Sequence, residues 1–155
     1  MAYRQRMKLG RLAKAMLFAG MACLVGCSDD RREERLRAAG AEPDLTDLLR
    51  VANITAGQRK FGRCAACHTI NAGGPNLAGP NLAGIYGKSL AEGNLRFGYT
   101  AALLAAGQRG RRWDARTLDA WLEDPQSVVP GTSMRFDGIA DPLDRADIIA
   151  FLQAS

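Results

Sequence analysis

Histidine and long apolar runs are scarce in this chain of 155 residues, and each scarcity excludes a class of protein. His68 is the only histidine, which excludes bis-histidine ligation of a metal within one chain. No apolar run reaches the roughly 20 residues that a membrane-spanning helix needs, so a polytopic membrane protein is excluded. The length allows one domain and little more. A hydrophobic share of 47% with 24% charged residues is typical of a globular protein.

Excess positive charge is also lacking once the start of the chain is set aside. The formal net charge is +5, but five of the 21 Lys and Arg residues precede Ala15, where no acidic residue occurs. The remaining 16 basic residues equal the 16 acidic ones. Nucleic-acid binding depends on neutralising phosphates with a surplus of Lys and Arg. We therefore expect no nucleic acid among the partners.

The first 26 residues have the pattern of a targeting segment. Residues 1–14 are positively charged, and residues 15–26 form a short apolar run, AMLFAGMACLVG. A charged start followed by about 12 apolar residues is typical of a secretory signal peptide. We predict a signal peptide over 1–26, and an uncleaved anchor is the alternative.

The end of the apolar run, Leu24-Val25-Gly26-Cys27, resembles the lipobox of bacterial lipoproteins. The resemblance implies cleavage before Cys27 and attachment of lipid to its sulfur. Several acyl chains anchor a protein stably where one does not. We therefore expect a lipid-anchored protein on the periplasmic side of a bacterial membrane. The alternative is a chance cysteine at the end of an ordinary signal.

Residues 27–53 are predicted to be the lipidated cysteine followed by a charged tether. Residues 28–49 hold four Arg against seven Asp and Glu, with Gly40 and Pro43 as helix breakers. Such a composition buries little surface, so we expect a coil with one or two helical turns. As an alternative, the leucines at 45, 48 and 49 have helical spacing and could dock on the following domain.

Residues 54–155 are predicted to form one all-α domain. Helical patterns cover residues 55–61, 99–106, 116–122 and 142–152, with Thr55 and Asp114 as caps and Asp141-Pro142 opening the last helix. Residues 69–98 are rich in Gly, Pro and Asn, which favours loops, and no alternating segment is long enough for a sheet. A domain with this many loop residues has too few packed side chains to form its own core. We therefore predict that something other than side chains fills the centre of the domain.

The motif Cys64-Ala65-Ala66-Cys67-His68 is the attachment pattern of a c-type haem. Two cysteines on one helical turn can form thioethers with the porphyrin vinyl groups, and the adjacent histidine then offers its Nε2 to the iron. A thioredoxin-like disulfide is disfavoured because a helix, not a strand, is predicted before the motif. A zinc site is disfavoured because four ligands are needed and the mature chain has no other histidine.

Met134 is the candidate for the second axial ligand. The other four methionines lie within residues 1–21, whereas Met134 follows the turn-forming stretch Pro130-Gly131. By itself, a loop methionine is as readily a core filler. Lys60 and Lys88 are weaker candidates, because an ammonium group must lose its proton before it binds a metal.

Over residues 53–152 the sequence resembles the class I cytochromes c of the bacterial and mitochondrial type. The matching positions are Gly57 and Phe61, Gly79 to Leu82, Tyr99, Trp113, Pro125, Pro130 to Met134, Phe136, Gly138, and Arg145 to Leu152.

The resemblance implies a small cytochrome c fold around one covalently bound haem c, with His68 and Met134 as the iron ligands. It implies that Pro80, rather than Pro75 in the first of two GPNLA copies, accepts a hydrogen bond from His68. It also implies that Tyr99 and Trp113 bind a haem propionate.

Three departures from the family pattern bear on the reduction potential. Leu103 stands where an asparagine is common, and Lys88 stands where an arginine often supports a propionate. Trp121 replaces a tyrosine whose hydroxyl meets the methionine sulfur, and we expect its ring to form part of the wall beside Met134.

Iron held by His and Met has no open position for a substrate, and this ligation raises the reduction potential. We therefore expect an electron carrier rather than an enzyme. The resemblance implies quinol–cytochrome c reductase as donor and a terminal oxidase or similar protein as acceptor. The alternatives are a fixed electron-input subunit of a larger oxidoreductase, a gas-sensing or peroxidatic haem protein, and a haem with only a structural role.

Residues 50–116 carry ten basic against two acidic residues, which favours a positive surface around the haem edge, with Arg59, Lys60, Arg63 and Lys88 as candidates.

Overall fold

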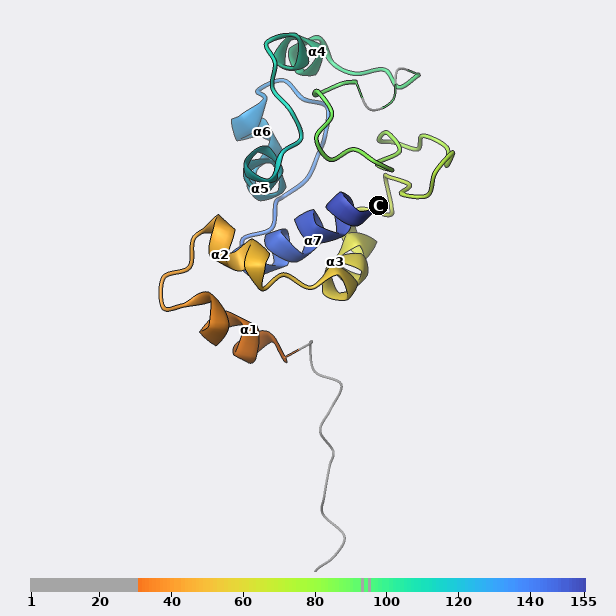
Figure 1. The fold of residues 1–155 in the computed structure, drawn as a ribbon. Helices are drawn as coiled ribbons and strands as arrows, with labels where there is room; N and C mark the ends of the chain where they lie inside the picture. The colour runs from red at the N-terminus through yellow and green to blue at the C-terminus, as the bar shows by residue number, and fades with distance from the viewer. Residues whose placement is uncertain (1–30, 93, 95) are drawn as a thin grey trace, which may run out of the picture.

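Helices joined by long loops make up the chain in the computed structural model, which describes residues 31–92, 94 and 96–155 (Figure 1). The predicted signal peptide and Cys27 lie outside these residues. The helices are α1 (Arg32–Ala39), α2 (Leu45–Arg50), α3 (Ile54–Lys60), the 3₁₀ turn η2 (Phe61–Arg63), α4 (Ala101–Gln108), α5 (Ala115–Glu123), α6 (Pro125–Val128) and α7 (Pro142–Ala154). Within the described ranges the only β pairing is an isolated bridge between Ser89 and Arg112. The predicted all-α class is confirmed.

The crossing of α3 and α7 is the frame of the fold. Gly57 lies where α3 meets α7, and a Cβ at this position would overlap the backbone carbonyl of Asp147. One turn later, the rings of Phe61 and Phe151 pack at 5.4 Å between centroids. The close approach of the two helices therefore depends on a residue without a side chain at position 57. The contact between the two helices fixes the direction in which η2 leaves α3 towards Cys64.

Side-chain caps define where the helices begin. Asp114 accepts from the backbone N–H of Thr117 to open α5, and Asp141 accepts from Leu143 and Asp144 to open α7, as predicted. The prediction of Thr55 as a cap was wrong. Helix α3 begins one residue earlier, and the Asn53 side chain caps it. Asparagine is at least as good a cap as threonine, and its position before the apolar Ile54 makes it the better one here.

Residues 32–50 differ from the coil that their composition predicted. They form α1 and α2, and α2 packs on α7. Leu48 is 3% exposed and belongs to a cluster with Ala39, Leu143 and Ala146. The leucines of α2 thus dock on the domain, which was the alternative interpretation. The composition of residues 32–50 did not predict these helices, because their apolar side chains are buried against α7, about 95 residues away in the sequence, and not within the segment itself.

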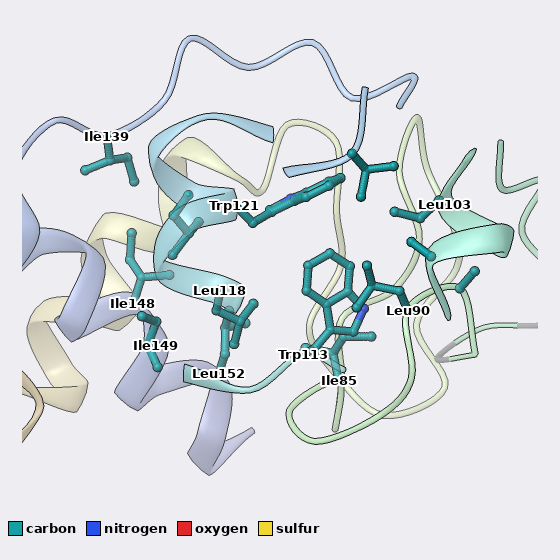
Figure 2. Close-up of a cluster of buried hydrophobic side chains, with 14 of the residues drawn as sticks. Ile85, Leu90, Leu103, Trp113, Leu118, Trp121, Ile139, Ile148, Ile149 and Leu152 are labelled. Atoms are coloured by element: carbon teal, nitrogen blue, oxygen red, sulfur yellow. The ribbon is translucent and has the colours of Figure 1, made fainter. Parts of the chain in front are cut away.

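The main core lies between α5, α7 and the loops that precede α4. Figure 2 shows Trp113, Leu118 and Trp121 between Ile148, Ile149 and Leu152 of α7 on one side and Leu90 and Leu103 on the other. Of the helices in the described ranges, none is long and apolar enough to cross a bilayer. Core residues such as Trp121, Ile148 and Leu103 also line a cavity, and this cavity is the candidate site.

Candidate functional site

A cavity of about 330 Å³ opens beside the two tryptophans. Its walls come from parts of the chain that are far apart in sequence: η2 and the segment after it, the loops before α4, and α4 itself, together with α5, the loop before α7, and α7. Most of the lining is apolar. The residues include Phe61, Cys64, Cys67, His68, Gly79, Pro80, Leu82, Ile85, Phe97, Tyr99, Leu103, Trp113, Leu118, Trp121, Leu122, Met134, Phe136, Ile148 and Leu152. All eight residues predicted to contact a cofactor in this domain are therefore brought to one cavity.

The two cysteines follow η2 on a single tight turn. Backbone hydrogen bonds run from the N–H groups of Cys67 and His68 to the carbonyl oxygen of Cys64, at 3.0 and 2.9 Å. Both thiols are free rather than joined in a disulfide. Cys64 is half-buried, and this burial raises its pKa, whereas Cys67 is exposed at the rim. The helical lead-in differs from the strand that a thioredoxin-like motif would need.

His68 is held in one orientation by the loop that carries Pro80. Its Nδ1 lies 2.8 Å from the carbonyl oxygen of Pro80. A carbonyl only accepts, so Nδ1 carries the hydrogen and the lone pair of Nε2 is left available. Burial lowers the pKa of His68 in spite of this hydrogen bond, which keeps the ring neutral. A neutral, oriented imidazole is the form that binds a metal.

The two GPNLA copies have different roles. Gly79 packs so closely on the imidazole of His68 that a Cβ at this position would overlap the ring. Its N–H donates to the carbonyl oxygen of Cys67 at 2.8 Å, which brings Pro80 beneath His68. Pro75, in the first copy, instead accepts from the Thr69 hydroxyl at 2.7 Å. The first copy therefore braces the loop, and the second one contacts the histidine.

Met134 lines the cavity and receives a hydrogen bond from α5. The indole Nε1 of Trp121 donates to Met134 Sδ over 3.2 Å. The ring of Trp121 is fixed in turn by an edge contact with Trp113, whose centroid lies 5.0 Å away. The loop itself is held by Gln126, whose Nε2 donates to the carbonyl oxygen of Thr132 at 2.9 Å. Position and orientation of the thioether are thus set by its neighbours.

The remaining predicted residues also have clear positions. Tyr99 is half-buried in the wall, packs edge-on against Phe97 at 5.1 Å, and has its pKa raised by burial. Trp113 is buried and lines the same cavity. Of the two lysines considered as ligands, Lys60 pairs with Asp147 at 3.1 Å, and neither it nor Lys88 lines the cavity.

Sequence reasoning missed several lining residues. Phe97, Leu118 and Leu122 form apolar wall, and no motif marks them out from ordinary core residues. Arg135, which was also missed, and Arg63, which the charge pattern had already named as a candidate for the haem edge, line the cavity and are exposed. Arg135 directly follows Met134 in the sequence, and this adjacency to a predicted ligand could have identified it.

The donor set fits a haem c. Two free thiols, a neutral imidazole with an available Nε2 and a thioether sulfur line one apolar cavity. Soft thioether and imidazole donors suit haem iron. In the ranges that the structure describes, no group of three or more His, Cys, Asp or Glu side chains is placed to hold a metal ion.

Comparisons with known proteins agree with this site. The sequence model of the family described as cytochrome c matches residues 54–155. A cytochrome c homolog from Bradyrhizobium diazoefficiens is 37% identical over 123 residues, covering 79% of this chain and 65% of that protein. Cytochrome c from Arabidopsis thaliana is 42% identical over 112 residues, covering 68% of this chain and 96% of the plant protein.

A solved structure also resembles the fold. Cytochrome cH from Methylobacterium extorquens superposes with a TM-score of 0.61 at 38% identity, covering 67% of this chain and all of that one. The chain spans 65% and 64% of the lengths of the bacterial relatives from Bradyrhizobium diazoefficiens and Rickettsia bellii. With the attachment motif, the fold and these relatives in agreement, the chain belongs to the cytochrome c family, in its class I form, whose members bind one covalently attached haem c.

Proposed function

We propose that this protein is a membrane-tethered carrier that takes single electrons from quinol–cytochrome c reductase and passes them to a terminal oxidase or a similar acceptor. Electron transfer by a haem protein is the general function of the cytochrome c family, whereas the tether and the named partners are specific to this proposal. The observation that carries the proposal is the pairing of His68 and Met134 in one cavity, each with its own hydrogen-bond partner. We infer that Cys64 and Cys67 hold the haem and that His68 and Met134 bind its iron.

Bound there, haem c supplies one-electron oxidation and reduction at its iron. The residues of the chain keep other chemistry out. Pro80 fixes the imidazole, Trp121 fixes the thioether, and the apolar wall excludes water. If His68 and Met134 bind the iron as proposed, the site would offer no place for a substrate. Outer-sphere electron transfer is the chemistry that remains.

A redox partner with an acidic surface suits the cavity. Arg63 and Arg135 are exposed cavity-lining residues, next to an attachment cysteine and to the proposed methionine ligand. Charge complementarity of this kind raises the association rate more than the affinity, and salt weakens it. The donor and acceptor named above are proposals from the family resemblance.

The test uses reduced holoprotein and membranes that contain a terminal oxidase. We expect the protein to be oxidised with many turnovers per oxidase, at a rate that falls as salt is added. If the protein is instead a fixed electron-input subunit, it will leave detergent extraction in a strong stoichiometric complex and will not exchange. That result would replace the carrier by the second candidate.

The hydrogen bond from Trp121 is expected to raise the reduction potential. A donor on the sulfur withdraws electron density from the iron and so favours the reduced state. Trp121→Phe removes the donor and keeps an aromatic wall. A hydrogen bond worth about 1 kcal/mol corresponds to roughly 40 mV for one electron. We expect a decrease of this size in a potentiometric titration.

Trp121→Tyr is the matched variant, because a hydroxyl can donate in place of the indole N–H. We expect it to recover part of the potential lost in Trp121→Phe. Equal potentials in the native protein and in Trp121→Phe, with the haem spectrum unchanged, would mean that the hydrogen bond does not act on the iron.

The proposed periplasmic location and lipid anchor depend on Cys27. We expect Cys27→Ser either to move the protein from the membrane to the soluble periplasmic fraction or to leave the precursor uncut, because no thiol remains for lipid attachment. Cell fractionation and the mass of the mature chain measure both outcomes. Cys23→Ser is the control, since it changes a cysteine in the same apolar run. Unaltered processing and membrane retention of Cys27→Ser would point to an uncleaved anchor.

A further inference from the structure

The N-terminal clasp, residues 32–50 with helices α1 and α2, is fastened to α7 at a buried carboxylate. Asp147 has no exposed side-chain surface. Arg35 of α1 donates to both its oxygens, at 2.6 and 3.0 Å. The backbone N–H of Asn53 donates at 2.8 Å, and Lys60 at 3.1 Å. Removing Arg35 would take away a cation that contacts both oxygens of this buried carboxylate, which is unfavourable.

A second set of contacts holds the two ends of the clasp. Arg32 pairs with Asp141 and Asp144 at the start of α7, the latter at 2.8 Å. At the other end, Leu48 of α2 packs against Leu143 and Ala146, neither of which has exposed surface. Polar and apolar contacts thus fix both helices of the clasp to the same face of α7.

The clasp precedes the residues that the family's sequence model matches, which begin at residue 54, whereas the clasp ends at residue 50. The clasp lies on the side of α7 away from α4, whose Leu103 lines the cavity (Figure 1). It contributes no lining residue to that cavity. Its contacts are therefore remote from the haem site.

The clasp changes the length of the free tether. A flexible segment from Cys27 to Asn53 would extend to roughly 90 Å at about 3.4 Å per residue. With the clasp docked, only residues 28–31 separate Cys27 from α1. The same estimate gives a reach of about 17 Å from Cys27 to Arg32. Such a short link cannot let the domain move over a neighbouring complex.

We propose that the clasp is a fixed part of the folded domain and holds it close to the membrane, with the α1 side towards the lipid and the α4 side away from it. The orientation rests on the proposed lipid attachment at Cys27, whereas the docking of the clasp does not. Partners then meet the cavity at a set height above the bilayer, and the carrier exchanges electrons by sliding in the membrane plane.

Hydrogen exchange of the full-length holoprotein in detergent tests the docking. We expect the amides of α1 and α2 to exchange on the order of 100-fold more slowly than an open helix of that length, because they open only when α7 is uncovered. Arg35→Gln should speed exchange in residues 32–50 by about tenfold or more, while α5 stays protected. Arg37→Gln, which changes an exposed arginine on the same helix, should have no effect.

Leu48→Ala covers the case in which Arg35→Gln does not fold, since it loosens α2 and keeps the ion pair of Arg35 with Asp147. Fast exchange of residues 32–50 in the native protein would overturn the proposal. So would unchanged exchange of the clasp in both Arg35→Gln and Leu48→Ala.

Energy transfer from a headgroup-labelled lipid to the haem, with the protein in vesicles, tests the orientation. We expect a narrow distribution of transfer efficiencies in the native protein and a broad one in Arg35→Gln. Equally broad distributions would overturn the orientation. If Cys27→Ser leaves membrane attachment unchanged while the clasp stays protected, the lipid proposal fails and the docking stands.

Discussion

Met134→Ala is expected to open the haem iron to carbon monoxide and to lower the reduction potential, while the haem stays attached through Cys64 and Cys67. Removal of the thioether leaves an axial position to water or a small ligand. Axial ligands set haem potentials over a range of about 0.8 V, so we expect a decrease on the order of 0.1 V or more. Electron donation to an oxidase should slow accordingly.

The measurements are a potentiometric titration and an absorption spectrum of the reduced variant under carbon monoxide. Ser133→Ala is the control, because it changes an exposed residue of the same loop and keeps the sulfur. A Met134→Ala variant that keeps its potential and does not bind carbon monoxide would show that another residue is the ligand. The carrier function would then lose its main support.

Cys67→Ala is expected to give little holoprotein. The cavity is lined by Trp113, Leu118 and Ile148 of the main core, so these side chains depend on a macrocycle held in place. Loss of one thioether removes half of the covalent attachment, and the free thiol of Cys64 alone must retain the haem. The mass of the purified chain and haem staining on a denaturing gel measure attachment, and thermal unfolding measures stability.

Ala66→Ser is the matched control for Cys67→Ala. It changes an exposed residue inside the same motif and keeps both cysteines and the histidine. We expect normal haem content in this variant. Normal haem content and stability in Cys67→Ala as well would mean that the motif does not attach haem in the proposed way.

Local signals predicted much of the fold. Helices α5 and α7 begin at Asp114 and Asp141 because an aspartate cap lies directly before each helical pattern. The attachment motif was also predictable from local sequence, because its residues, 64 to 68, are contiguous. The crossing of α3 with α7 could not be predicted locally, because nothing in the sequence around Gly57 says which helix packs on it.

Contacts between distant residues could not be read from the sequence. The ion pair of Arg35 with Asp147 joins positions 112 apart, so composition predicted a coil where the chain forms the N-terminal clasp. The choice of Pro80 over Pro75 also needed more than local pattern, because both lie in identical GPNLA segments. In the folded loop the carbonyl of Pro80 accepts from His68, whereas the carbonyl of Pro75 accepts from Thr69.

The central claim is that His68 and Met134 close both axial positions of a haem that exchanges single electrons. A potentiometric titration of the native holoprotein, under argon and again under carbon monoxide, tests it most directly. A ligand that binds only reduced iron raises the midpoint potential by linkage. We expect one single-electron transition with the same midpoint potential under both gases. A midpoint that rises under carbon monoxide would contradict it, because the iron would then have an open position.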